Sequence, residues 1–335
     1  MDTSMKLSAN PKFFLLMLLT ALVVLSALSL VIGSSSLGID DSIKWLTGKA
    51  DATTDAVFRF IRLPRTLACL LAGASLAVAG LLLQTALNNP LASPGIIGVN
   101  TGAGFFVVAA SVLFPALFWI RSVAAFSGAL IISTSVYLLA RKTGASKTTI
   151  ILAGIAFSSL IAAATDTLVL VYPNSVMDRN AFFIGGFSSI HTNVLLFSMP
   201  FIVIGLAGAW SLVGRLDLLL LGDEVATSLG LDVKRCRFLT ILFASALAAS
   251  AVSIAGLIGF VGLIVPHITR QLVGNELKIA LPVNILIGSC LVLLSDIAAR
   301  ILFSPFEIPA GILLSAIGAP FFLHLILSRH RNRYA

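Results

Sequence analysis

Three arginines and one aspartate next to apolar segments are the side chains whose spacing points most directly to chemistry. Arg62 and Arg65 lie three residues apart, and Pro64 suits the first turn of a helix, so both arginines can share one helical face. Asp296 and Arg300 are four residues apart, the spacing of an acid–base pair on a helix. Because a charge inside a membrane is costly unless paired, we expect Asp296 to be paired. The arginines are expected to anchor at the membrane surface or to dock carboxylates of a partner.

Motifs of catalytic and metal-binding sites are missing from the sequence. It contains no G-x-x-x-x-G-K-[ST] phosphate loop and no H-E-x-x-H zinc motif, and its cysteines are isolated. We therefore expect no bound metal, no bound ATP and no catalytic residue in this chain. The enzyme alternative is an intramembrane serine protease with Ser75 as nucleophile and His267 or His324 as base, but Gly-x-Ser is common by chance in apolar segments.

The composition indicates a membrane protein. Of the 335 residues, 58% are hydrophobic and 11% are charged, against about 25% charged in a soluble domain. A soluble protein of this size has too little interior to bury so much apolar surface. The net charge of +8 is scattered between apolar stretches, which disfavours nucleic acid as a partner. We expect a single transmembrane domain over residues 1–335.

A helix of about 20 apolar residues spans a bilayer, and the sequence predicts ten such segments in an all-α, polytopic fold. The apolar run 238–269 is too long for one span, so we divide it near Gly256. Residues 181–189 are too short to cross and predict an outer or re-entrant piece. Spans two to five and seven to ten form two groups that run in opposite directions, as in an inverted repeat. The expected spans are 13–32, 66–88, 96–118, 122–140, 148–172, 194–213, 238–256, 257–274, 279–299 and 308–328.

Charge placement predicts that both termini are cytoplasmic. This orientation puts 14 of the 22 Lys and Arg residues on the cytoplasmic side, as the positive-inside rule favours. The first apolar stretch is longer than that of a signal peptide and predicts a retained span. Arg59, Arg62 and Arg65 fall on the outer side and run against the rule, so these charges need another role.

The longest predicted cytoplasmic loop, about 214–237, is too apolar to be a solvated linker. Its apolar residues have helical spacing, which predicts a short helix with one exposed apolar face. Such a face indicates a docking surface for another protein. The alternative is a helix lying on the membrane, which Asp223 and Glu224 disfavour because anionic lipid repels them. The apolar residues are Val225, Ala226 and Leu229; Gly222 and Gly230 bound the helix, and Asp232 can cap the next one.

Two stretches rich in glycine and proline predict interruptions of the helices. Residues 84–99 carry no charge, and irregular backbone at membrane depth is tolerated mainly where it lines a cavity; the alternative is a plain turn. Further along, Gly256, Gly259 and Gly262 recur every three residues, which predicts a flat side for close helix packing. Pro266 is expected to kink that span and to free a backbone carbonyl.

Together these segments resemble the FecCD-type permeases of binding-protein-dependent ABC importers. The resemblance covers about residues 60–325 and keeps the family's order of motifs. It implies ten spans per subunit and a homodimer in the cytoplasmic membrane. It also implies two ATPase subunits that hold ATP and Mg, and a periplasmic or lipid-anchored substrate-binding protein. The matching stretches are Arg62–Thr66, Asn89–Val99, Gly222–Gly230, Gly259–Arg270, Asp296–Arg300 and Ile317–Pro320.

The resemblance also implies roles for single residues. Arg62, Arg65 and Arg300 look like the arginines that pair with glutamates of the binding protein, and we expect Arg300 to approach the other two. The cytoplasmic loop looks like the coupling helix that sits in a groove of the ATPase. Its coupling residues are Leu221, Gly222, Asp223, Glu224, Ala226, Leu229 and Gly230, and the residues of the cytoplasmic gate are Asn89, Leu91, Lys147 and Thr148.

The family resemblance implies that the cargo is a metal chelate. A ferric siderophore is the first expectation, and haem and cobalamin are the alternatives. An ion-coupled secondary transporter would also be polytopic with inverted repeats. It is less favoured because Asp166 and Asp296 are the only acids within the predicted spans, and Asp296 has a partner in Arg300.

Overall fold

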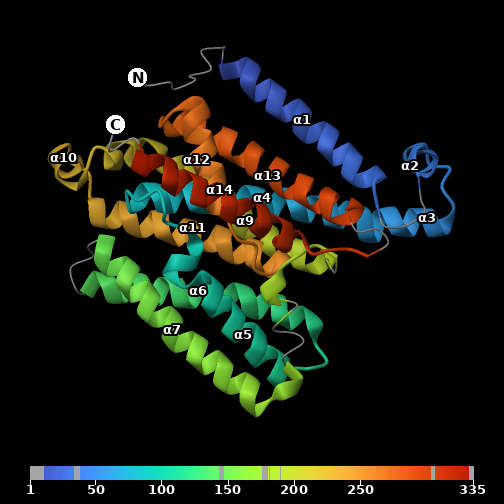
Figure 1. Cartoon of the computed structure of the whole chain (residues 1–335), viewed down its shortest axis with the longest axis horizontal. Coiled ribbons are helices and arrows are strands. Elements are labelled where there is room, and N and C mark those ends of the chain that lie inside the picture. The colour runs from blue at the N-terminus through green and yellow to red at the C-terminus, as the bar shows by residue number, and fades with distance from the viewer. Residues whose placement is uncertain are drawn as a thin grey trace.

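The computed structural model describes residues 11–33, 38–142, 147–175, 180, 182–188, 190–302 and 306–331, and this part of the chain contains helices and no strand (Figure 1). The predicted all-α, polytopic fold is confirmed, because each of the ten predicted spans corresponds to one helix. These helices are α1 (Pro11–Val31), α4 (Leu63–Ala86), α5 (Val99–Leu113), α6 (Phe118–Lys142), α7 (Lys147–Val171), α9 (Thr192–Leu220), α11 (Val233–Ala255), α12 (Val261–Val273), α13 (Leu277–Ile301) and α14 (Ala310–Arg331).

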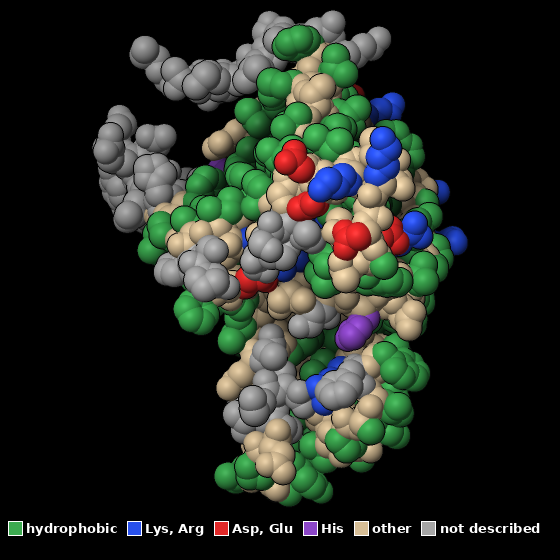
Figure 2. Space-filling view, turned by 90° about the vertical axis from the view of Figure 1, so that its right-hand side faces the viewer, with side chains coloured by type: hydrophobic (Ala, Val, Ile, Leu, Met, Phe, Trp, Pro, Cys, Tyr) green, Lys and Arg blue, Asp and Glu red, His purple; other side chains and the backbone are tan. Residues whose placement is uncertain are grey.

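Short helices lie at the two ends of the bundle. Figure 1 shows α10 at one end and α2 and α3 at the opposite end, and we call these the α10 end and the α2–α3 end. Acidic and basic side chains gather on the face of the α2–α3 end (Figure 2). The short elements are α2 (Ile39–Leu46), α3 (Ala52–Val57), the π-helical turn η1 (Phe58–Arg62), the 3₁₀ turns η2 (Pro94–Ile97) and η3 (Pro173–Ser175), and α10 (Asp223–Ser228).

Among the described residues, seven helices are long and apolar enough to cross a membrane by themselves. Two of the remaining three are shorter than predicted: α5 has 15 residues and α12 has 13. Each of these two helices follows a non-helical stretch that hydropathy counted as part of the span. Residues 182–188 do not cross, as predicted; they lie against the turn after α11, where Gly186 N donates to Ala255 O at 2.8 Å.

Helix packing follows the predicted inverted repeat. The central pair, α4 and α11, run in opposite directions and pack on each other. Two helices from the other half of the chain pack on each member of this pair: α12 and α13 pack on α4, and α5 and α6 pack on α11. At the periphery, α7 contacts α5 and α6 as α14 contacts α12 and α13. The order α4–α7 therefore maps onto α11–α14 with the direction of every helix reversed, as inverted repeats require.

The centre of the bundle depends on glycines of α4. A Cβ added to Gly80 would overlap the carbonyl group of Gly262 on α12, and a Cβ added to Gly73 would overlap that of Gly288 on α13. These are contacts between backbones, so a flexible side chain cannot move aside. Because packing between membrane helices relies on such close approach, α4 can hold α12 and α13 only if these positions stay without side chains.

Replacing Gly80 with Ala is expected to destabilise the purified permease by about 1–3 kcal/mol, because the new methyl group overpacks the contact between α4 and α12. Thermal unfolding in detergent measures the effect. The matched control is Gly214→Ala in α9, where an added Cβ meets no atom within 4 Å. This control should be neutral or stabilising by up to about 1 kcal/mol. Equal melting temperatures for the two variants would contradict the packing account.

The glycine stripe predicted around α12 is wrong in two of its three positions. Gly256 has φ +69° and ends α11, while Gly259 lies in a non-helical turn and an added Cβ there would meet only Ser315 Oγ, at 3.9 Å. Only Gly262 lies in the helix and packs closely, against α4. A period of three places residues on one side only where the chain is helical, and here the chain reverses between Gly256 and Phe260.

The free backbone carbonyl predicted at Pro266 is confirmed. Pro266 is buried within α12 and has no N–H to donate to the carbonyl of Gly262 four residues earlier. That carbonyl accepts a hydrogen bond from Gln84 Nε2 of α4 instead, at 3.1 Å. The oxygen of the Gln84 amide in turn accepts from Arg270 at the other end of α12. Gln84 therefore ties the last turn of α4 to α12 on both sides of Pro266.

Candidate functional site

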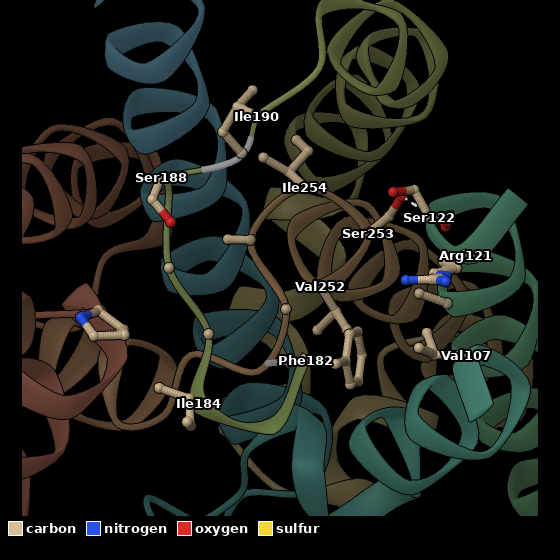
Figure 3. A pocket seen from close by; sticks show the side chains of 16 residues that line it. Val107, Arg121, Ser122, Phe182, Ile184, Ser188, Ile190, Val252, Ser253 and Ile254 are labelled. Atoms are coloured by element: carbon tan, nitrogen blue, oxygen red, sulfur yellow. Dashed lines mark hydrogen bonds between the residues drawn. The ribbon is translucent and has the colours of Figure 1, made fainter. Parts of the chain in front are cut away.

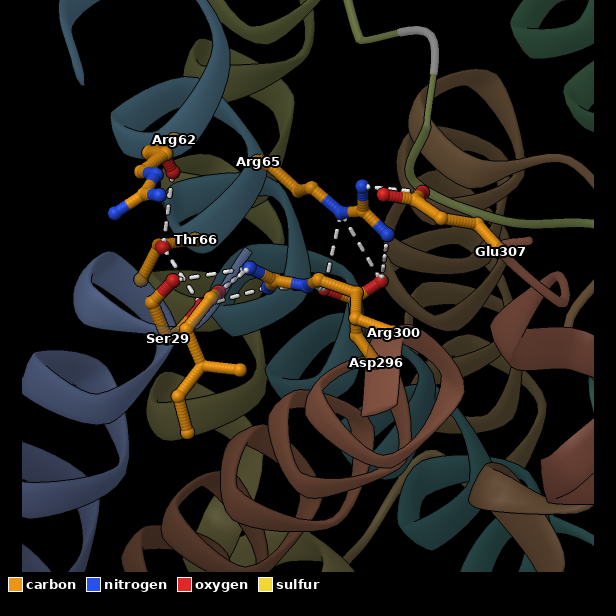
Figure 4. A network of polar contacts seen from close by, with 8 residues as sticks. Ser29, Arg62, Arg65, Thr66, Asp296, Arg300 and Glu307 are labelled. Atoms are coloured by element: carbon orange, nitrogen blue, oxygen red, sulfur yellow. Dashed lines mark hydrogen bonds and ion pairs between the residues drawn. The ribbon is translucent and has the colours of Figure 1, made fainter. Parts of the chain in front are cut away.

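A buried charge cluster lies at the α2–α3 end of the bundle (Figure 4). Asp296 of α13 is fully buried, and its carboxylate accepts from Arg65 Nη2 at 2.9 Å and from Arg300 Nε at 3.0 Å. Arg65 also donates through Nη1 to Glu307 Oε2 at 2.8 Å. One aspartate thus neutralises arginines from two helices, and Glu307 adds a second negative charge. The pairing predicted between Asp296 and Arg300 is confirmed.

The same cluster caps the end of α1. Arg300 Nη1 donates to the carbonyls of Ser29 and Ile32 at 3.0 and 2.7 Å, and Arg62 Nη1 donates to those of Leu30 and Val31 at 2.6 and 3.0 Å. Two guanidinium groups therefore occupy carbonyls that a helix leaves unpaired at its C-terminus, where its dipole favours positive charge. The cluster fastens α1 to α4 and α13.

The structure brings Arg62, Arg65 and Arg300 together, as expected, but each is only 3–7% exposed. Their guanidinium groups bond to Asp296, to Glu307 and to main-chain carbonyls of α1. The docking role that the resemblance implies stays a prediction. A carboxylate of a binding protein would have to compete with these internal acceptors.

The α10 end carries the predicted short helix. Gly222, with φ +106°, precedes α10, and Gly230, with φ +86°, follows it. Leu231 N donates to Ala226 O at 3.0 Å and Gly230 N to Thr227 O at 2.9 Å, which together form a Schellman C-cap. The predicted cap of α11 is also confirmed, since the Asp232 side chain accepts from Arg235 N at 3.0 Å.

The exposed face of α10 differs from the predicted one by a single residue. Leu221 and Leu229 are 59% and 58% exposed, and Val225 between them is also exposed. Ala226 was expected on this face but is fully buried. Ala226 therefore fits α10 onto the bundle, and only the larger apolar residues can contact a partner directly. Asp223 and Glu224 lie in the first turn of α10, where the helix dipole favours negative charge.

The predicted gate loop joins α4 to α5. Asn89 Oδ1 accepts from Leu91 N at 2.9 Å, and Asn89 O accepts from Ala92 N at 3.1 Å, so Asn89 organises a tight turn in which Leu91 is exposed. Past this turn, η2 packs on α7, where a Cβ added to Gly154 would overlap Ile96 O. Thr148 is exposed at the start of α7, while the Lys147 side chain and residues 143–146 lie outside the described residues.

Two cavities adjoin these features. One of about 550 Å³ lies at the α10 end between the gate loop and α12, and its lining includes Asn88, Asn89, Arg270 and Leu221. The other, of about 300 Å³, lies among α5, α6, α11, residues 182–188 and Ile190 (Figure 3). Its wall includes Phe182 and Arg121, and Ser253 Oγ donates to Ser122 O beside it at 2.8 Å. The first cavity agrees with the expectation that stretch 84–99 lines a cavity, whereas sequence reasoning did not predict the second.

The described residues offer no enzyme site. No group of three His, Cys, Asp or Glu side chains among them could hold a metal ion, and Cys69, Cys236 and Cys290 are free thiols. Ser75 is buried in α4, and its hydroxyl has no hydrogen-bond partner in the described part of the chain. The His324 side chain lies outside the described residues.

Long apolar helices in an inverted repeat, with a short helix at one end beside exposed apolar side chains, are the architecture of a polytopic membrane permease. Residues 21–328 match the FecCD transport family, and the chain belongs to that family. Its members are permease subunits of ABC importers, so this chain is a transport subunit and not an enzyme.

Similar proteins cover nearly the whole chain. The Fe(3+)-citrate import system permease protein YfmE of Bacillus subtilis is 36% identical over 97% of this chain and 97% of its own length. The hemin transport system permease protein HmuU of Yersinia pestis is 35% identical over 97% and 98%. A solved structure described as an inward-facing metal-chelate type ABC transporter superposes with a TM-score of 0.82 at 33% identity, covering 95% of this chain and all of that one.

Proposed function

We propose that this permease carries a ferric chelate of the siderophore or citrate type inward across the cytoplasmic membrane. Support comes from similarity to permeases named for Fe(3+)-citrate and for siderophore transport, at 36–38% identity over more than 90% of the chain. Haem and cobalamin are the alternatives, since permeases named for those cargoes are 35–38% identical. The chain itself binds no cofactor, and ATP with Mg belongs to the partner ATPase.

The proposed assembly is a permease homodimer with two ATPase subunits and a periplasmic or lipid-anchored binding protein. The α10 end faces the cytoplasm, together with both termini, and the α2–α3 end faces outward. The observation that carries this orientation is the short helix α10 between Gly222 and Gly230, where the exposed side chains of Leu221, Val225 and Leu229 offer an apolar surface to a protein partner. The polar, mixed-charge face of the α2–α3 end suits a soluble binding protein (Figure 2).

The cargo is tested with proteoliposomes that hold this permease and its ATPase, supplied with the cognate binding protein. Ferric citrate, a ferric hydroxamate, haem and cyanocobalamin are offered separately with ATP. We expect uptake of one of the two ferric chelates and at least about tenfold less of haem and cobalamin. Preferential uptake of haem or cobalamin would overturn the proposed substrate class while leaving the importer itself intact.

A further inference from the structure

A buried arginine connects α10 to the body of the bundle. Arg237, in the second turn of α11, is only 3% exposed. Its Nη2 donates to both carboxylate oxygens of Asp223, the first residue of α10, at 2.9 and 2.8 Å. On its other side, Nε donates to the carbonyl of Ala86, the last residue of α4, at 3.0 Å. One guanidinium therefore holds three helices at a single point.

The end of α4 that Arg237 contacts also determines where the gate loop begins. Asn88 adopts a left-handed conformation with φ +45°, and the N–H groups of Asn88 and Asn89 donate to the carbonyls of Thr85 and Gln84 at 3.1 and 3.0 Å. This is a Schellman cap, which satisfies those two carbonyls and leaves that of Ala86 to Arg237. The arginine also faces the negative end of the α4 dipole. A shift of Arg237 would therefore act directly on the cap that starts the turn at Asn89.

The last turn of α4 is linked to α12 as well, through Gln84. Its amide bonds to the Gly262 carbonyl freed by Pro266 and to Arg270, and the latter lines the cavity beside Asn89. An unbroken series of polar contacts thus runs from Asp223 through Arg237 to the cap of α4, and from there to the gate loop and α12. Contiguous contacts make a route possible, but energetic coupling along it requires a direct test.

We propose that Arg237 is the positioning residue that transmits movement of α10 to loop 88–98; this inference depends on the proposed function. Arginine suits the task because separate nitrogens of its rigid, planar guanidinium can bond a carboxylate and a carbonyl at the same time. Lysine keeps the charge but concentrates it at one ammonium group, so it can hold Asp223 or Ala86 firmly but not both in this geometry. The charge on Arg237 is buried, and its pairing with Asp223 offsets the cost of that burial.

The test compares chelate uptake per ATP hydrolysed in proteoliposomes that contain the intact complex. Arg237→Lys is expected to lower this ratio about tenfold, within the range of ordinary coupling free energies. Asp223→Asn should lower the uptake per ATP by a similar factor. The double variant should have a ratio no lower than either single variant, because both changes break the same contact. Asp223→Glu retains the ion pair and should keep most of the ratio. The matched control is Arg141→Lys, the same substitution at an exposed arginine in the last turn of α6.

The outcomes separate this inference from the proposed function. If the wild type shows no ATP-dependent uptake, the proposed function fails. If the wild type is active but Arg237→Lys stays within twofold of its ratio, or if the two single losses multiply in the double variant, the transmission role is wrong. Should Arg237→Lys fail to assemble, Asp223→Asn decides the matter, with its melting temperature measured alongside, because the Asp223 side chain is 41% exposed while its neutralisation removes the carboxylate from the buried Arg237. An unchanged ratio in that variant would overturn the inference.

Discussion

Asp296→Asn is expected to cost the folded permease roughly 3–5 kcal/mol, the penalty for removing one partner from a buried ion pair. The fully buried Asp296 carboxylate neutralises Arg65 and Arg300, so the amide would leave two guanidinium groups buried beside a neutral side chain. Thermal unfolding in detergent and the yield of monodisperse protein measure the loss. Asp40→Asn, at an exposed acid on α2, is the matched control and should be neutral. A melting temperature for Asp296→Asn equal to that of this control would show that the cluster is not needed for the fold.

The same cluster changes how the docking prediction must be tested. Arg65→Glu would add a third carboxylate beside Asp296 and Glu307, so a loss of uptake could follow from misfolding alone. Uptake by such a variant therefore has to be normalised to the amount of folded protein. Docking is supported only if binding-protein affinity falls while the melting temperature stays near that of the wild type.

Replacing both Leu221 and Leu229 with Glu should release the ATPase subunits. The two leucines flank α10 and are more than half exposed, and burying a leucine side chain against a partner is worth about 1.5–3 kcal/mol. Losing two such contacts predicts an affinity at least about 100-fold weaker, since each 1.4 kcal/mol is a factor of ten. Co-purification of the ATPase in detergent measures the effect.

The control for this double variant is the same pair of substitutions on α2. Ile39 and Ile43 are also exposed, at the opposite end of the bundle, so Ile39→Glu with Ile43→Glu should leave ATPase binding intact. Retention of the ATPase by the Leu221 and Leu229 variant at the level of this control would remove α10 from the ATPase interface.

Hydropathy predicted the ten spans because bilayer thickness sets the length of an apolar segment, whatever its partners are. Hydropathy alone did not mark the break at Gly256–Phe260, where every residue is apolar or glycine. The length of the run and its glycines predicted a division near Gly256, and α11 ends there. Glycines six residues apart therefore have different roles: Gly256 ends α11, whereas Gly262 lies within α12 and packs against α4.

Local charge pairing was predictable and distant pairing was not. Asp296 and Arg300 are neighbours on one helix, so their spacing alone predicted the pair. Arg65 meets Asp296 and Glu307 across 231 and 242 residues of sequence, and only tertiary packing brings them together. Likewise, helical spacing predicted an apolar face on α10, but in a six-residue helix it could not tell that Ala226 would be buried.

The central claim is that this chain works as the membrane subunit of an ATP-driven importer. The most direct measurement is ferric chelate uptake by proteoliposomes with and without the ATPase, with ATP or a non-hydrolysable analogue, and with an imposed proton or sodium gradient. The account predicts uptake only when the ATPase, the binding protein and hydrolysable ATP are all present, and no effect of the gradient. Uptake by the permease alone, driven by the gradient, would contradict it and identify an ion-coupled transporter.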